Sequence, residues 1–125
     1  MLSAMVIDTL LVLFLLSLLI ITVSMLAHVW IRVPYYPSKK QVVEKMIALA
    51  ALQDGKTVYD LGAGDARLLI TAKRTCPGII AIGIEFVPSV WIYGLFRIWR
   101  SKQRVEYRLG NVFRHSLKDA DIVFT

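Results

Sequence analysis

The chain has 125 residues, 57% of them hydrophobic, and a formal net charge of +6. Its mean hydropathy of +0.61 is too high for an ordinary soluble domain of this size, while its length favours a single folded domain. The one cysteine, Cys76, excludes an internal disulfide and a cysteine-rich metal site, and we expect no bound metal.

The hydrophobic excess lies at the N-terminus. Leu10 to Ile31 contains no Lys, Arg, Asp or Glu, and as a helix it would be roughly 33 Å long, enough to cross a hydrocarbon core of about 30 Å. It is longer than the apolar part of a signal peptide, and no small-residue cleavage pattern follows it. We therefore predict a single-pass transmembrane anchor over residues 1–32, with Ser17 and Thr22 bonding back to helix carbonyls.

Charge predicts the orientation of this anchor. Arg32, Lys39 and Lys40 follow it, and the part from residue 32 onward holds all fifteen Lys and Arg with eight of the nine acids, a net charge of +7. The positive-inside rule places this C-terminal domain in the cytoplasm. Its charge favours contact with the lipid bilayer; a solvated basic surface is the alternative, and nucleic acid is disfavoured because no RNA-binding motif is present.

A connector and a helix come next. Val33–Pro37 contains two prolines, which predicts an extended connector. Ser38 and Gln41 fit a capping box at the start of a helix. Apolar residues at helical spacing continue this helix to Leu52, before the turn at Asp54-Gly55.

A strand, a glycine turn and a second helix follow. Thr57–Leu61 is rich in strand-forming residues, Gly62 to Ala66 reads Gly-Ala-Gly-Asp-Ala, and Arg67–Thr75 has helical spacing. This order opens a nucleotide-binding βαβ unit, in which glycines let a ligand approach the main chain and the helix amides face it. Gly62, Ala63 and Gly64 are therefore candidate cofactor-binding residues.

Two acids near this turn narrow the type of cofactor. Asp60 lies two residues before Gly62, and Asp65 directly follows Gly64. Carboxylates here would repel the pyrophosphate of a dinucleotide but attract a cationic amino group. They therefore favour S-adenosylmethionine and disfavour a nicotinamide-dependent oxidoreductase. The alternative is that both acids only cap the following helix.

The second predicted strand, Ile79–Phe86, is a continuous apolar run that ends in an acid, as expected of a buried parallel strand. Glu85 lies 21 residues after Gly64, a spacing that fits hydrogen bonds to the two hydroxyls of a ribose. We predict that Glu85 and the adjoining Phe86 bind the cofactor.

Aromatic and basic residues alternate along Pro88–Arg104. We predict a helix with a broad apolar arc that covers the sheet and with basic residues opposite. The arc comprises Trp91, Ile92, Leu95, Phe96, Ile98 and Trp99. In an alternative interpretation, part of this arc is surplus to the sheet and rests on the membrane interface.

The third and fourth strands are predicted over Val105–Leu109 and Ile122–Thr125. Between them, the amide oxygen of Asn111 could accept a hydrogen bond from adenine, with Val112 beside it and Phe113 packed on the ring. An ordinary Gly-Asn turn is the alternative. No His, Cys or Ser arrangement for covalent catalysis is visible, so the catalytic residues stay unknown.

The motifs resemble a known family. The run VYDLGAGDARLLITAKR, with AIGIEF and LGN downstream, resembles the class I S-adenosylmethionine-dependent methyltransferases. YYPSKKQVVEKMIALA followed by DLGAGDAR is similar to a membrane-anchored group of protein-lysine methyltransferases that carries a DLGSGDGR motif. The resemblance implies an α/β Rossmann-like fold, S-adenosyl-L-methionine as cofactor, and a protein substrate embedded in the membrane, such as the ATP synthase c-ring protein.

The resemblance also assigns residues. Asp60, Gly62 and Gly64 match the methionyl-binding loop, and Glu85 matches the acid that binds ribose. Ala66 replaces the last glycine of the motif, a change that an added methyl group should permit. The position of Asn111 is usually held by aspartate in the family, which weakens the adenine assignment.

The family sheet has seven strands in the order 3-2-1-4-5-7-6, whereas residues 33–125 supply only four, in the expected order 3-2-1-4. We therefore expect the N-terminal part of a methyltransferase domain, truncated after strand 4 and without the acceptor-binding residues. The alternative is a non-catalytic, membrane-anchored ligand-binding half-domain or a truncated fragment.

Overall fold

The computed structural model describes residues 2–31 and 36–125, and the chain divides into two compact units, Met1–Pro34 and Tyr35–Thr125. Arg32, which contributes to the predicted orientation, lies outside the described residues. The same holds for the predicted connector, except for Tyr36 and Pro37.

The first unit is one long apolar helix, α1 (Leu2–Ile31). Its segment Ala4–Ala27 has a mean hydropathy of 2.9 and is long and apolar enough to cross a membrane by length and composition. As predicted, two hydroxyls bond back to the helix: Ser17 donates to the Phe14 carbonyl at 2.7 Å and Thr22 to the Leu18 carbonyl at 2.8 Å. These bonds satisfy hydroxyl groups that would be costly to leave unpaired in hydrocarbon.

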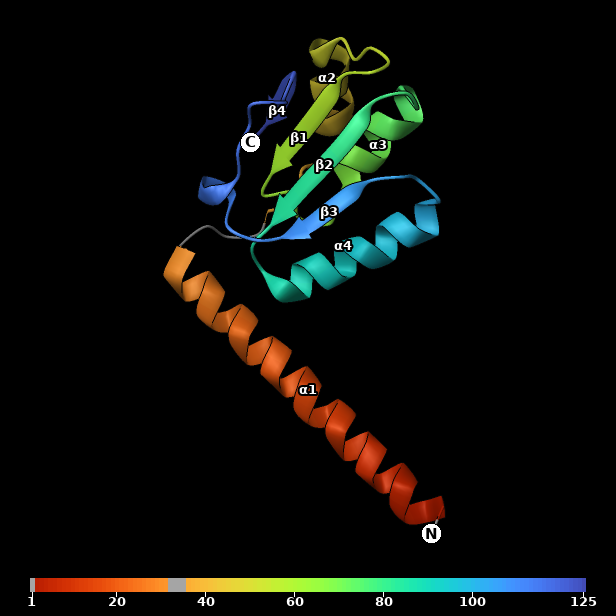
Figure 1. The fold of residues 1–125 in the computed structure, drawn as a ribbon, viewed down its shortest axis with the longest axis vertical. Coiled ribbons are helices and arrows are strands. Elements are labelled where there is room, and N and C mark those ends of the chain that lie inside the picture. The colour runs from red at the N-terminus through yellow and green to blue at the C-terminus, as the bar shows by residue number, and fades with distance from the viewer. Residues whose placement is uncertain (1, 32–35) are drawn as a thin grey trace. The chain divides into compact units, whose positions relative to one another are not determined.

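The second unit is built on a parallel sheet of four strands in the order β3-β2-β1-β4 (Figure 1). This confirms the predicted α/β fold and strand order. The strands are β1 (Thr57–Leu61), β2 (Ile80–Glu85), β3 (Glu106–Leu109) and β4 (Ile122–Phe124). β2 is buried at every position except Ile80, which explains why its sequence is continuously apolar instead of alternating.

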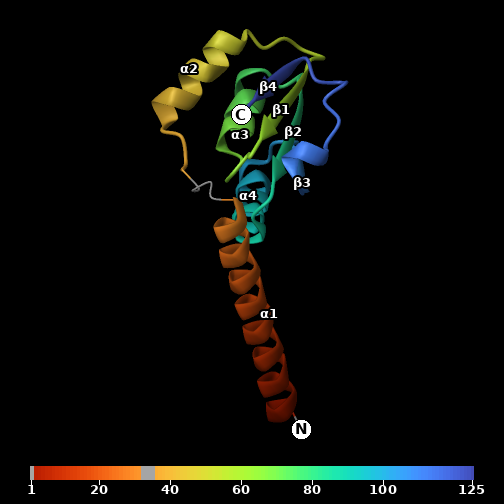
Figure 2. The same ribbon diagram turned by 90° about the vertical axis from the view of Figure 1, so that its left-hand side faces the viewer.

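Helices connect and cover these strands. Their bounds are α2 (Lys40–Ala50), α3 (Arg67–Thr75), α4 (Pro88–Ser101) and the short 3₁₀ helix η1 (Val112–Arg114). α3 packs against β2 and α2 packs against α3, while η1 lies on the other side of the sheet (Figure 2). The main core lies between the sheet and α2 and α3, and Leu69 and Val58 are completely buried in it.

The predicted capping box at the start of α2 is wrong. The helix begins at Lys40 with Lys39 as its N-cap, and no side chain caps it. The amides of Val42 and Val43 donate instead to the Lys39 carbonyl, at 2.9 and 3.1 Å. The carbonyl of Ser38 accepts a hydrogen bond from the Arg67 guanidinium at 2.9 Å, so a tertiary contact holds the residue that was predicted to cap the helix.

The prediction that the whole apolar arc of α4 covers the sheet is also wrong. The residue that α4 buries is Gly94, where an added Cβ would lie only 2.5 Å from Cε1 of Tyr107 on β3. Trp91 stacks on the Tyr107 ring at a centroid distance of 6.4 Å. Because Gly94 has no side chain, the helix approaches β3 on this face, and much of the arc points away from the sheet.

Gly94 gives a direct test of this packing. In an exposed helix interior, glycine to alanine stabilises by about 1 kcal/mol. Here we expect Gly94→Ala to destabilise the protein by about 1–3 kcal/mol, because the new methyl overpacks against a Tyr107 ring that is pinned by stacking on Trp91. Thermal unfolding of the detergent-solubilised chain, followed by circular dichroism, measures the change.

The matched control is the same substitution in a Tyr107→Leu background. The shorter side chain removes the ring atoms that crowd the new methyl, so Gly94→Ala should become neutral or stabilising there. A higher melting temperature for Gly94→Ala in the native background would contradict the close approach of α4 to β3.

Candidate functional site

The carboxyl ends of the strands gather three loops at one edge of the sheet. The amides of Gly62 and Ala63 both donate to the Ile84 carbonyl at 2.9 Å, and the amide of Gly110 donates to the Glu85 carbonyl at 2.8 Å. The strand order reverses at β1, because β2 and β3 lie on one side of it and β4 lies on the other. Ligands of open α/β sheets bind beyond the carboxyl ends of strands at such a switch point.

The turn after β1 depends on left-handed backbone. Gly62 has φ +81° and Gly64 has φ +57°, a region that glycine enters without the steric cost other residues meet. Ala66 also adopts φ +61° and is fully buried. The methyl group that was expected to be permitted at this position is accommodated, in a conformation that costs an L-residue roughly 1–2 kcal/mol.

Glu85 connects the ends of β1 and β2. Its side chain is buried, its Oε2 accepts from the Gly64 amide at 2.9 Å, and its Oε1 accepts from the Val87 amide at 2.8 Å. Both oxygens therefore already serve the protein backbone. A carboxylate oxygen has room for a second donor, so the predicted contact with ribose hydroxyls would share these oxygens with the loop.

Asp60 is the carboxylate that the site leaves uncompensated. It is buried at the end of β1, and within residues 2–31 and 36–125 no hydrogen bond or ion pair to its side chain is recorded. Burial raises the pKa of Asp60 from 3.8 to about 7, and the negative charges of Glu85 and Asp65 add to the rise. A cation placed beside Asp60 would reverse this effect.

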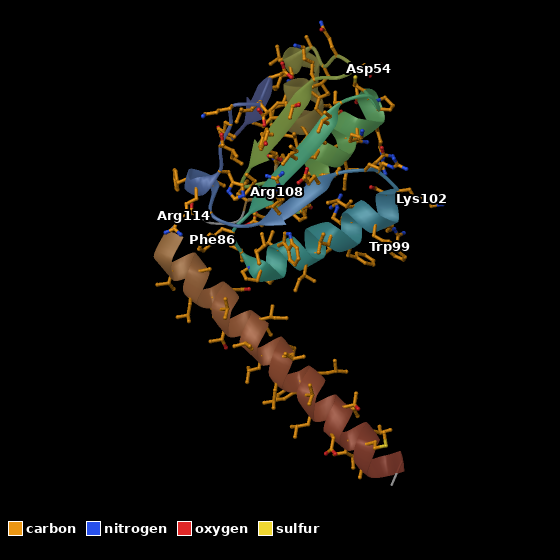
Figure 3. All side chains as sticks on the ribbon, in the orientation of Figure 1. Asp54, Phe86, Trp99, Lys102, Arg108 and Arg114 are labelled. Atoms are coloured by element: carbon orange, nitrogen blue, oxygen red, sulfur yellow. The ribbon has the colours of Figure 1, made fainter. Side chains whose placement is uncertain are left out.

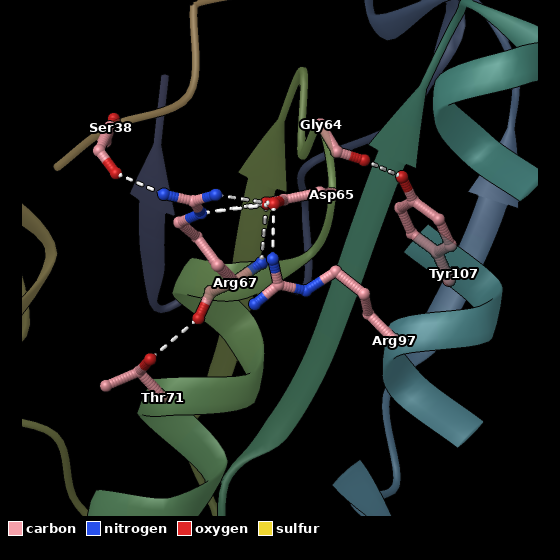
Figure 4. Close-up of polar contacts among 7 residues, drawn as sticks. All are labelled: Ser38, Gly64, Asp65, Arg67, Thr71, Arg97 and Tyr107. Atoms are coloured by element: carbon pink, nitrogen blue, oxygen red, sulfur yellow. Dashed lines mark hydrogen bonds and ion pairs between the residues drawn. The ribbon is translucent and has the colours of Figure 1, made fainter. Parts of the chain in front are cut away.

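Asp65 has a different environment, although it follows the same turn (Figure 4). Its Oδ2 accepts from Arg67 at 2.8 Å and from Arg97 at 2.7 Å. Burial acts to raise the pKa of Asp65, but the hydrogen bond from Arg67 and the charges of Arg97 and Arg67 outweigh it, and the pKa lies below its ordinary value. Its negative charge is therefore used within the protein.

Asp65 also bonds to the amide of Arg67 at 3.2 Å, close to the helix-capping alternative considered from the sequence. Neither arginine was predicted as part of the site. Arg67 could have been noticed from its position two residues away, but Arg97 lies 32 residues away on α4, and no local pattern connects it to the turn. Together the two arginines join α3 and α4 to the glycine loop.

A tyrosine was missed in the same way. The hydroxyl of Tyr107, on β3, donates a hydrogen bond to the carbonyl of Gly64 (Figure 4). The amide of Gly64 bonds to Glu85, so both backbone polar groups of Gly64 are held from neighbouring strands. The shape of the loop therefore depends on residues from β2 and β3 as well as on its own glycines.

The remaining predicted residues lie at the ends of β2 and β3. Phe86 follows Glu85 and is exposed (Figure 3), and Val112 begins η1. The Asn111 amide oxygen accepts from the Phe113 amide at 2.9 Å, which is the capping geometry of the turn alternative and leaves one lone pair for a ligand. Phe113 is 93% exposed, so its ring is free to contact a ligand. The part of the chain that the structure describes holds no cluster of metal-ligating side chains.

Comparisons with known proteins agree with this arrangement. Over 94 residues, the chain is 32% identical to a protein-lysine N-methyltransferase of Saccharolobus islandicus, a match that covers 74% of this chain and 58% of that protein. Over 67 residues, it is 34% identical to a lysine N-methyltransferase of Xenopus laevis that is named for the ATP synthase c-ring protein, covering 54% of this chain and 28% of that methyltransferase. The chain thus spans about half or less of these relatives. No protein-family profile matches it.

Solved structures show the same fold. An RNA methyltransferase from Salinibacter ruber in complex with S-adenosyl-L-homocysteine is 33% identical with a TM-score of 0.67, covering 70% of this chain and 58% of that chain. A methyltransferase from Thiobacillus denitrificans, 23% identical with a TM-score of 0.63, covers 83% of this chain and 41% of that chain, and shares the fold. The chain therefore resembles the class I S-adenosylmethionine-dependent methyltransferases in sequence and in fold.

Proposed function

We propose that this chain is the cofactor-binding part of an S-adenosyl-L-methionine-dependent methyltransferase that α1 anchors to a membrane. The observation that carries the proposal is the uncompensated, buried carboxylate of Asp60 beneath a glycine turn whose amides and carbonyls are fixed by neighbouring strands. Two curated relatives are named lysine methyltransferases of proteins, which supports lysine on a protein substrate as the methyl acceptor.

The three carboxylates have separate roles in this proposal. Asp60 is the partner for the ammonium of the methionyl group, directly or through a water molecule. Glu85 binds the ribose hydroxyls with the lone pairs that its two backbone contacts leave open. Asp65, neutralised by Arg67 and Arg97, holds the loop in position and does not contribute net charge to the ligand.

The adenine subsite is formed by side chains and backbone from the neighbouring loops. We propose that Phe86, Asn111 and Val112 surround the base, while Gly62, Ala63 and Gly64 allow the methionyl group close to the main chain. Methyl transfer itself is an in-line displacement in which the protein mainly positions the reactants. If the acceptor is lysine, its amine must lose its proton before it attacks the methyl group.

The membrane part of the proposal depends on α1. A 24-residue apolar segment near the N-terminus and the positive charge that follows it support a single membrane span, with the C-terminal domain on the cytoplasmic side. S-adenosylmethionine would be supplied from that compartment. A substrate protein embedded in the same membrane would then share the surface on which the domain is held.

Binding of S-adenosylmethionine should depend on the proton of Asp60. The free site titrates near pH 7, and an ammonium beside Asp60 favours the ionised form, so binding releases a proton. We expect the affinity to rise roughly tenfold from pH 6 to pH 7.5. Calorimetric titration of the folded, detergent-solubilised chain in buffers of different ionisation enthalpy measures both the affinity and the protons released.

Variants assign this effect to the site. Asp60→Asn should bind more weakly at pH 7.5 and lose the pH dependence, and Glu85→Gln should bind more weakly at both pH values. Glu44→Gln, which changes an exposed carboxylate on α2, should match the native chain. NAD should not bind. Failure of a folded chain to bind S-adenosylmethionine, or equal binding of NAD, would refute the proposal.

Without ligand, the same carboxyl should destabilise the fold at high pH. Asp60 ionises near 3.8 in the unfolded chain and near 7 in the folded chain, so folding stability falls as the pH rises between these values and stays low above them. We expect Asp60→Asn to stabilise the protein by up to roughly 4 kcal/mol at pH 8 and by little at pH 4. Urea unfolding at several pH values measures the difference.

Asp121→Asn provides a comparison of opposite sign. The hydrogen bond from the Thr57 amide and the contact with Lys56 hold the pKa of Asp121 below its ordinary value, so its loss should destabilise the protein at neutral pH and above and have no effect below the folded pKa. An Asp60→Asn difference that stays constant from pH 4 to pH 8 would show that Asp60 does not titrate in this range.

A further inference from the structure

Helix α4 carries an apolar stripe that the protein does not cover. Ile92, Leu95, Phe96 and Trp99 follow the spacing that aligns side chains on one helix face. All four are exposed, Phe96 by 51% and Trp99 by 76%. The face packed on the sheet is marked by buried Gly94, two residues and about 200° of helix rotation from Ile92 and Phe96. Figure 3 shows Trp99 on the side of α4 away from β3.

Unpaired positive charge adjoins this stripe. Arg100, Lys102 and Arg104 lie at or just beyond the C-terminal end of α4, and all three are exposed. Within the described residues no ion pair is recorded for them, and the sequence between Glu85 and Glu106 contains no acid. A helix with aromatic and aliphatic side chains on one face and basic residues beside them has the pattern of a helix that lies in a membrane interface.

Chain connectivity keeps this helix near a membrane if α1 spans one. Residues 32–39 separate the end of α1 from the start of α2. Eight fully extended residues reach at most about 28 Å. The domain would therefore stay next to the headgroup layer, where even a modest affinity of α4 for lipid holds it at the surface.

From these observations we propose that α4 is a second membrane-contact element, and that its occupant is a bilayer containing anionic lipid. The stripe of Ile92, Leu95, Phe96 and Trp99 enters the boundary between headgroups and acyl chains. Arg100, Lys102 and Arg104 contact anionic headgroups, each contributing favourable electrostatic attraction. The inference rests on the proposed anchoring by α1.

This contact would also orient the candidate cofactor site. Arg97 lies on α4 between the residues of the stripe and bonds to Asp65 of the glycine loop at 2.7 Å. Because the same helix meets the membrane on one side and holds the loop on another, the loop would sit at a fixed height above the bilayer. A methyl acceptor near the membrane surface would be presented to the site at a constant distance.

Spin labels on the full chain in lipid nanodiscs test the proposal. In a Cys76→Ser background, single labels are attached through Phe96→Cys on the stripe, Leu16→Cys on α1, and Lys118→Cys on an exposed loop. Accessibility to oxygen reports hydrocarbon, and accessibility to a water-soluble nickel chelate reports solvent. The nanodiscs contain phosphatidylcholine alone or with about a third phosphatidylglycerol.

In anionic nanodiscs we expect the label at position 96 to be accessible to oxygen and protected from the chelate, like the label at position 16, while the label at position 118 stays accessible to the chelate. Arg100→Gln, Lys102→Gln and Arg104→Gln should each lower the ratio of membrane-bound to lifted α4 roughly fivefold. Nanodiscs of phosphatidylcholine alone should give weaker protection.

The other outcomes overturn the inference in distinguishable ways. If the chelate reaches position 96 while position 16 reports hydrocarbon, α1 is an anchor and α4 does not touch lipid. Protection of position 96 from both reagents means that a second copy or another protein segment covers the stripe. If the chelate reaches both positions, the anchoring has failed, and the inference fails with it.

Discussion

The close approach of the glycine turn to the end of β2 is the constraint on which the rest of the site depends. Two successive amides, of Gly62 and Ala63, share the Ile84 carbonyl, and the next amide donates to Glu85. This pattern requires the left-handed backbone at Gly62 and Gly64. It sets where α3 begins and leaves the side chain of Asp60 buried beneath the turn, so the backbone geometry decides the electrostatic environment of the site.

Three carboxylates lie close together there, and each meets its desolvation cost differently. Asp65 has two arginines, Glu85 has two backbone amides, and Asp60 has no recorded partner in the described part of the chain. A buried charge without a partner is costly, so the pKa of Asp60 rises to about 7. A site that lacks one positive charge is complementary to a ligand that supplies one, which is a stronger argument for a cationic ligand than the glycine pattern alone.

The sequence predicted the strands and their order because each strand is a continuous apolar run bounded by turn residues, and it located the acids because they end those runs. It could not predict what those acids contact. Arg97 reaches Asp65 across 32 residues and Tyr107 reaches Gly64 across 43, and such pairings are decided by packing between elements. The capping box failed for the same reason, since Arg67 uses the Ser38 carbonyl.

Gly94 shows how packing inside the domain determines its surface. The absence of a side chain at this position lets α4 approach Tyr107, and Tyr107 in turn holds the Gly64 carbonyl. A helix that buries its glycine face must direct the opposite face outward, and on α4 that face carries Ile92, Phe96 and Trp99. The exposed stripe is therefore a consequence of the same contact that shapes the glycine loop. A larger residue at position 94 would rotate or lift the helix and change both.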